Sequence, residues 1–324
     1  MWFKNCQLYT FTEPCTLTPE GLAADLQNKA YQPCNSHDLK SMGWVAPTGQ
    51  STDQAEPPLV HAANGFLLLC LKTEDKIIPS SVIKEMLAER IAEIEGSTGR
   101  KVRKKEKDQL KDDIFQSLLP RAFSRTSQTL AYIDPAKGLL VVDAGSPRKA
   151  ETLIEFLRKT LGSLKVQLPE TQSIPILLTD WISKHHYPAE FTIEDGCVLK
   201  DVEEGGVIRC QKQNLLTEEI QGLIKTGREI TQLRLSWCDQ ISFVLKEDFS
   251  ITSMKFLEGV RDQSNEVLSE TAEAKFDADF CIMTETLRYF FEQMLLVFGK
   301  AQKEEAVKSA SEPTDLPDAH EAEA

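Results

Sequence analysis

Residues 100–125 read RKVRKKEKDQLKDDIFQSLLPRAFSR and form a basic block in an acidic protein. The block holds nine Lys/Arg and four Asp/Glu, so its net charge is +5, whereas the 324-residue chain has a net charge of −13. The rest of the chain therefore carries −18. Because mixed charges would serve solubility equally well, this concentrated positive field indicates a surface that binds a polyanion, above all nucleic acid.

The same block predicts the local fold. A helix is expected from about residue 102 to 119, because Pro120 ends it. Its apolar stripe consists of Leu110, Ile114 and Leu118, flanked by Phe115 and Leu119. A preceding helix should follow Pro79, be capped by Ser80 or Ser81, and stop at a glycine-bounded turn. So short a link predicts an antiparallel helical hairpin with its tip at residues 96–105.

The stripe of the second helix changes character along its length. It continues backwards as Lys111, Lys107 and Lys104, so it is apolar near the body and cationic towards the tip. These cations crowd the helix N-terminus, where the macrodipole disfavours positive charge, and that cost points to an anionic partner. The alternative is an ordinary solvated helix face on which Lys and Glu are mixed for solubility.

Length and composition limit the number of domains and the class of protein. A chain of 324 residues predicts two or three domains. It has no run of 18 apolar residues and no signal-peptide pattern, which favours a cytoplasmic protein without a membrane span. Its eight cysteines form no Cys-x-x-Cys pair, which indicates free thiols rather than disulfides or a zinc site. Residues 301–324, with seven acids and two lysines, predict a disordered acidic tail.

Strand signals on both sides of the helical hairpin predict an α+β fold with antiparallel sheets. Strands are expected at 2–12, at 65–72 and on both sides of a turn at 134–138, followed by a helix over 147–161. From residue 190 onward short strands dominate, interrupted by a helix at 217–225. A long apolar helix from Asp279, as its N-cap, to Phe298 ends the ordered part.

Candidate catalytic groups are few. His185 and His186 are adjacent, and a loop explains them better than a metal site does. Asp277 and Asp279, together with Asp143, are the carboxylates that a metal-dependent nuclease would need, although helix capping explains Asp279 more simply. No nucleophile motif is present. The sequence therefore predicts a protein that is not an enzyme and has no metal or cofactor.

Phe123 lies between Arg121 and Arg125, just beyond the end of the second helix. An aromatic ring between two cations can stack on a nucleobase or dock into a partner subunit. Ordinary packing beneath the hairpin is the alternative.

Several short strings resemble the family of recombination-associated proteins RdgC. They are MWFKN at 1–5, MGWVAP at 42–47, HAANG at 61–65, IPSSVIK at 78–84, LLPRAFSR at 118–125, SQT at 127–129, GGVIR at 205–209, RDQ at 261–263 and FDADF at 276–280. The resemblance covers residues 1–300 in order and with similar spacing. It implies two crescent-shaped subunits that pair at both ends to form a ring-shaped homodimer. It also implies binding of single- and double-stranded DNA without sequence preference, association with the nucleoid, and restraint of the recombinase RecA.

The resemblance also implies roles for particular residues. It places Phe123 at a contact between subunits, and it makes Lys76, Arg121, Arg209, Lys212 and Gln213 candidates for a basic hole through which the duplex passes. The basic tip matches the family in character, and its candidate DNA contacts are Arg100, Lys101, Arg103, Lys104 and Lys107.

The residue patterns and the resemblance together predict the domain organisation. Residues 1–75 and 126–168 should form a central α+β domain, 76–125 the hairpin tip, 169–300 a β-rich base domain with a C-terminal helix, and 301–324 the tail. The expected function is that of a DNA-binding ring that limits recombinase activity. The alternatives are a regulator that contacts the recombinase directly and a metal-dependent nuclease.

Overall fold

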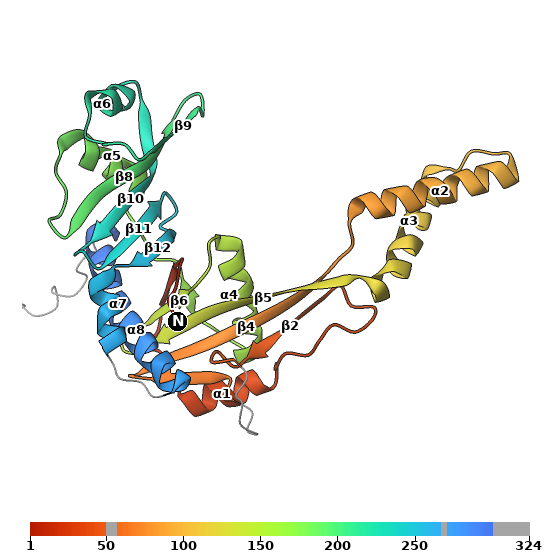
Figure 1. The fold of residues 1–324 in the computed structure, drawn as a ribbon, viewed down its shortest axis with the longest axis horizontal. Helices are drawn as coiled ribbons and strands as arrows, with labels where there is room; N and C mark the ends of the chain where they lie inside the picture. Colours follow the sequence, from red (N-terminus) through yellow and green to blue (C-terminus); the bar gives the residue numbers. More distant parts are fainter. Residues whose placement is uncertain (50–56, 267–270, 301–324) are drawn as a thin grey trace, which may run out of the picture.

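The computed structural model describes residues 1–49, 57–266 and 271–300, so the acidic tail expected at 301–324 lies outside the described residues. The chain forms two antiparallel sheets, one of seven strands and one of five, with helices packed on both (Figure 1). The predicted α+β class with antiparallel sheets is confirmed. No helix within the described ranges is long and apolar enough to cross a membrane.

The larger of the two sheets has seven strands. Its strands are β1 (Gln7–Phe11), β2 (Lys40–Val45), β3 (Val60–Ala63), β4 (Phe66–Ile77), β5 (Phe123–Asp134), β6 (Leu139–Val142) and β7 (Val166–Gln167). They pair in the order β2-β4-β5-β6-β1-β7, and β3 pairs with β4 next to β2. The long β4 and β5 pair from Leu67 opposite Ile133 to Ile77 opposite Phe123.

One face of this sheet is covered by α1 (Pro19–Gln27) and α4 (Pro147–Leu161). Leucines of both helices share a buried cluster with alternate residues of β4 and β5. At the sheet edge, the chain after α1 crosses directly over Gly43. A Cβ on Gly43 would lie 2.2 Å from the Tyr31 Cα, so only glycine allows this crossing.

The five-stranded sheet forms a second unit. Its strands are β8 (Phe191–Asp201), β9 (Val207–Gln211), β10 (Arg228–Trp237), β11 (Ile241–Lys246) and β12 (Ile251–Phe256), paired in the order β12-β11-β10-β8-β9. Around it lie α5 (Ile174–Lys184), α6 (Glu218–Lys225), α7 (Glu258–Glu266) and α8 (Ala272–Phe298). The helices predicted at 147–161 and 217–225 are therefore present. The last helix begins earlier than predicted, because its N-cap is Thr271.

The helix α8 joins the two sheets. Asp134 at the end of β5 is buried and receives two hydrogen bonds from the Arg288 guanidinium, at 2.7 and 2.9 Å. The same guanidinium lies 4.2 Å above the ring of Phe66. At the other end of the interface, Cys6 and Ile251 exchange backbone hydrogen bonds. One hydrophobic core therefore runs from the seven-stranded sheet through α8 into the five-stranded sheet.

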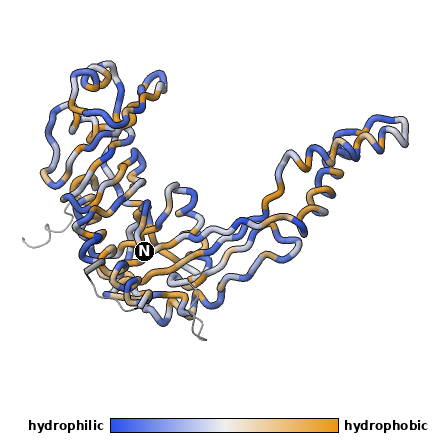
Figure 2. The backbone as a smooth tube through the Cα atoms, viewed as in Figure 1, coloured by the Kyte–Doolittle hydropathy of each residue, from blue (hydrophilic) through white to orange (hydrophobic). Residues whose placement is uncertain are grey.

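Residues 78–122 form an arm that extends away from the seven-stranded sheet. The arm contains α2 (Ser80–Thr98), α3 (Lys104–Leu118) and the short 3-10 helix η1 (Leu119–Arg121), and α2 packs against α3. The N-cap of α2 is Pro79, so the predicted serine cap is wrong. Figure 1 shows the arm and the five-stranded sheet at opposite ends of the seven-stranded sheet, with a concave side between them. Apolar residues continue along both arm helices, interleaved with hydrophilic ones (Figure 2).

Candidate nucleic-acid interface

The turn between α2 and α3 is held by two carboxylates. Glu95 accepts a hydrogen bond from the Val102 backbone N–H at 2.9 Å, while Gly99, at φ +65°, ends α2 in the left-handed conformation. Glu106 accepts from the Arg103 backbone N–H at 3.0 Å and from two nitrogens of the Arg100 guanidinium at 2.7 and 2.8 Å. These hydrogen bonds from Arg100 and Arg103 lower the pKa of Glu106 to about 2. The carboxylate is therefore charged throughout the physiological range.

The tip residues fall into two groups. Arg100 is already paired with Glu106, so its charge is largely compensated. Lys101, Lys104, Lys105 and Lys107 are exposed, and within the described ranges none of them has an ion-pair partner. Arg103 is exposed at the N-cap of α3. Four ammonium groups are thus gathered at the N-terminal end of one helix with their donors open to a ligand.

Near the foot of the arm, too, one candidate cation is bound within the chain and the other is exposed. The Lys76 ammonium donates to the carbonyl oxygens of Asn35, Ser36 and Leu119 at 2.9, 2.9 and 3.1 Å. All three of its protons are therefore used to fasten the arm to the loop before β2. Arg121, by contrast, is exposed at the end of η1.

Phe123 is 86% exposed, the largest exposed fraction among the large apolar side chains of the described residues. It lies opposite Ile77, itself 47% exposed, on the last rung of the β4–β5 ladder. Packing beneath the arm is therefore not the role of Phe123 in this chain. The ring is free for a partner.

Another group of candidates lies on the five-stranded sheet, at the end of the molecule opposite the arm (Figure 1). Arg209 is exposed on β9, and Lys212 follows that strand in the left-handed conformation, at φ +54°. The Gln213 amide donates to the Glu219 carboxylate at 3.3 Å. Arg234, on β10, lines the same hollow as Arg209 and Lys212. The sequence reasoning missed Arg234, although its place between the buried Leu233 and Leu235 indicates an outward-facing cation.

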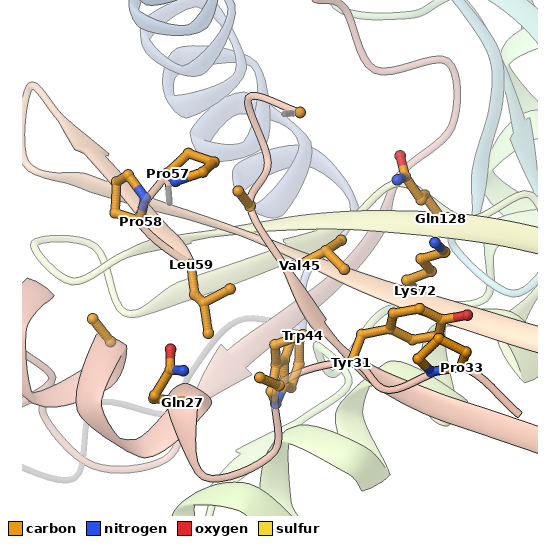
Figure 3. A pocket seen from close by; sticks show the side chains of 14 residues that line it. Gln27, Tyr31, Pro33, Trp44, Val45, Pro57, Pro58, Leu59, Lys72 and Gln128 are labelled. Atoms are coloured by element: carbon orange, nitrogen blue, oxygen red, sulfur yellow. The ribbon is translucent and has the colours of Figure 1, made fainter. Parts of the chain in front are cut away.

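A larger hollow, of about 830 Å³, lies between α1, β2 and the crossing segment near Tyr31 (Figure 3). Its lining includes Trp44, Pro57 and Pro58, and the Lys72 ammonium lies 4.2 Å over the Tyr31 ring. None of the DNA-binding candidates borders it. Size alone therefore does not select this hollow as the functional site.

Each carboxylate considered for a nuclease contacts another group of the chain. Asp143 accepts backbone hydrogen bonds from Lys4 and Asn5, and Asp277 lies 3.0 Å from the His61 imidazole. Asp279 is buried and forms an ion pair with the amino group of Met1. The N-cap of α8 is Thr271, so the predicted capping role of Asp279 is wrong. Within the described residues no group of three His, Cys, Asp or Glu side chains has the arrangement of a metal site.

Comparison with known proteins gives one consistent result. The family model described as "Putative exonuclease, RdgC" matches residues 1–301. A protein of Aeromonas hydrophila named "Recombination-associated protein RdgC" is 44% identical over 301 residues, which cover 92% of this chain and 98% of that protein. The protein of the same name from Tolumonas auensis is 44% identical over 306 residues, covering 94% of this chain and 100% of its own length.

Proposed function

This chain belongs to the RdgC family, and from that premise we propose that it is a sequence-independent DNA-binding protein that acts in recombination. The observation that carries the proposal is the group of exposed lysines at the arm tip, Lys101, Lys104, Lys105 and Lys107. They stand on an otherwise acidic chain, and together they can neutralise phosphates of either single- or double-stranded DNA. Phosphate contacts provide affinity without reading the base sequence.

We further propose that two copies close into a ring around the DNA. The support is the concave side between the arm and the five-stranded sheet, together with the exposed ring of Phe123 at the foot of the arm. A ring retains DNA with few contacts per subunit, because the duplex must thread through it or open it to leave. Occupying DNA in this way in the nucleoid limits the access of a recombinase such as RecA, and no enzymatic step is required.

The test removes the unpaired lysines of the tip and leaves the pairing of Arg100 with Glu106 intact. In a variant with Lys101, Lys104, Lys105 and Lys107 all changed to Ala, affinity should fall about equally for unrelated DNA sequences. The slope of log affinity against log salt should decrease by roughly 0.9 for each duplex phosphate that the variant no longer neutralises. The control changes four exposed lysines outside the arm, Lys29, Lys159, Lys165 and Lys184, to Ala. The last three form ion pairs with carboxylates, so Lys29→Ala is also compared alone with Lys104→Ala. An unchanged slope in the tip variant would exclude the tip from the DNA path.

Two other functions predict different results. The family description names an exonuclease, so DNA should be incubated with the protein and Mg²⁺ or Mn²⁺. Cleavage that disappears on changing Asp277 and Asp279 to Asn would make the protein an enzyme. A regulator that contacts the recombinase directly would inhibit it to the same extent when competitor DNA is added in excess, whereas inhibition by DNA occupancy would then be relieved.

A further inference from the structure

The strand β9 lies at an edge of the five-stranded sheet and pairs with β8 (Figure 1). A tight turn joins the two strands. In it Asp201 accepts the backbone N–H groups of Glu203 and Glu204, both at 3.0 Å, and Gly205 adopts φ +73°. Because β9 spans only Val207–Gln211, it is held by few inter-strand contacts, and one further bond to β8 would restrain it strongly.

The register of this hairpin places two cysteines directly opposite each other, Cys197 on β8 and Cys210 on β9. Opposite residues of an antiparallel pair have Cα atoms about 4.5–5.5 Å apart. A disulfide joins Cα atoms about 4.4–6.8 Å apart, so the backbone already has the spacing for one. Cys70, the other cysteine in a strand of the described residues, faces Val45 and Leu130 instead.

The two thiols also meet in space. Opposite residues of a strand pair point to the same face, and Cys197 and Cys210 both belong to the hydrophobic core behind the sheet. Their exposed fractions are 4% and 8%. The Cys210 side chain is close enough to hydrogen-bond with the Cys197 thiol. A bond between the two sulfur atoms therefore requires no large rearrangement of the core.

A small oxidant has room beside this pair. Both cysteines border the hollow of about 460 Å³ that Arg209 and Lys212 line. Hydrogen peroxide takes up about the volume of two water molecules, each of which has roughly 30 Å³ in the liquid. Burial, and then the nearby Cys210 thiol, raise the pKa of Cys197 to about 12, so Cys197 keeps its proton. Cys210 is the more exposed of the two and lies on the edge strand, so it meets the oxidant first.

We propose that Cys197 and Cys210 are a redox-active pair that a peroxide converts into a disulfide between β8 and β9. The Cys210 sulfur attacks one oxygen of hydrogen peroxide, the O–O bond breaks, and a sulfenic acid and one water form. The Cys197 sulfur then attacks the sulfenic sulfur. The S–S bond forms, the S–O bond breaks, and the hydroxyl leaves as a second water with the Cys197 proton. Two electrons pass from the two thiols to the peroxide.

The disulfide would change the stability of the hairpin. It closes a loop over residues 198–209, and such a closure restricts the unfolded chain. It also keeps the edge strand that carries Arg209 joined to β8 when the hydrogen bonds between the strands open. This inference stands apart from the DNA-binding function proposed above, because it concerns the thiols alone.

The test uses the full-length protein, treated with hydrogen peroxide. The remaining thiols are then alkylated with N-ethylmaleimide in denaturant, and trypsin cuts the chain without reduction. Trypsin cleaves after Lys200, Arg209 and Lys212, so peptides 185–200 and 210–212 stay together only through a disulfide. We expect the joined peptides at the summed mass less two hydrogen atoms. The exposed Cys238 reports whether the peroxide has reacted at all.

Thermal unfolding gives the second measurement. Peroxide should raise the unfolding temperature of the wild type by several degrees, and dithiothreitol should reverse the rise. Cys70→Ala, at a buried strand cysteine without a cysteine opposite, should behave in the same way. Cys210→Ala should show no reversible rise, and Cys197→Ala replaces it if it fails to fold. The proposal is overturned if Cys238 is oxidised while both cysteines of the pair carry the alkyl label, or if either is joined to a different cysteine.

Discussion

Glu74 is a buried carboxylate near the end of β4. It accepts hydrogen bonds from the Tyr31 hydroxyl at 2.5 Å, from the Cys34 backbone N–H at 3.0 Å, and from Ser124. These donors, Ser124 foremost, lower the pKa of Glu74 to about 2. Burial, together with the bond to Glu74, raises the pKa of Tyr31 to about 12, so the phenol keeps the proton that it donates.

This arrangement predicts a pH dependence. Because the folded-state pKa of Glu74 is below its ordinary value of 4.5, its contribution to stability is complete above about pH 4.5. The contribution is lost as the pH falls towards 2. Glu74→Gln should therefore lower the unfolding temperature most at pH 7, and the difference from wild type should shrink below pH 4. Thermal unfolding of both proteins at pH 7, 5, 4 and 3 measures it, with the exposed Glu85→Gln as control. A difference that grows in acid would contradict the assignment.

At the scale of elements, the arm is built from helices that interact locally and is fastened to the body by contacts from elsewhere. Helices lie over both ranges predicted from apolar spacing and Pro120, because those signals act within a few residues. Neither the pairing of Arg100 with Glu106 nor the fastening of Lys76 is visible in such a pattern. Lys76 binds carbonyl groups about 40 residues away on both sides, and only the folded chain brings them together.

Phe123 begins β5 at the foot of the arm. Because its side chain is 86% exposed, Phe123→Ser should leave the fold of the subunit intact. If the ring docks into a second subunit, the change removes about 1.5–3 kcal/mol of burial at that junction. Equilibrium sedimentation should then show a weaker assembly, and bound DNA should dissociate faster. Tyr289→Ser, at an exposed aromatic residue of α8, is the matched control. Unchanged mass and DNA retention would remove Phe123 from the interface, and a collapsed circular dichroism signal would make it a core residue.

In the molecule as a whole, the pair of the buried Asp134 and the partly buried Arg288 fixes α8, and with it the five-stranded sheet, relative to the seven-stranded sheet. Removing Arg288 leaves the buried carboxylate with only the backbone N–H groups of Ala136 and Lys137 as donors, so Arg288→Met should destabilise the protein by about 1.5–3 kcal/mol. Lys137→Met, which breaks an exposed ion pair with Glu292, should cost under about 1 kcal/mol. Denaturant unfolding of both variants measures the difference. Equal costs would mean that the Asp134–Arg288 pair does not hold the two sheets together.

The sequence predicted the fold class and most elements. It did not predict that the candidate DNA-binding residues form two separate groups. Arg209 and Lys212 belong to one sheet and the tip lysines to the arm, and only the tertiary structure places these groups at opposite ends of a concave side. For Asp279, a local sequence signal led to a prediction that the structure contradicts. Its position before an apolar run resembled a cap, yet the helix extends past it because Thr271 supplies the cap.

The seven-stranded sheet narrows as it approaches the arm. β6 pairs with β5 only from Ala131 onward, and β2 pairs with β4 only as far as Asp75, so two strands alone enter the arm at Ile77 and Phe123. A neck of two strands would bend more easily than a wide sheet, and the arm beyond it would then act as a lever. The 19 residues of α2 span about 28 Å, so a turn of about 10° at the neck carries the tip through about 5 Å. Elastic bending over a few residues would then move the tip lysines that far while the core stays packed as it is.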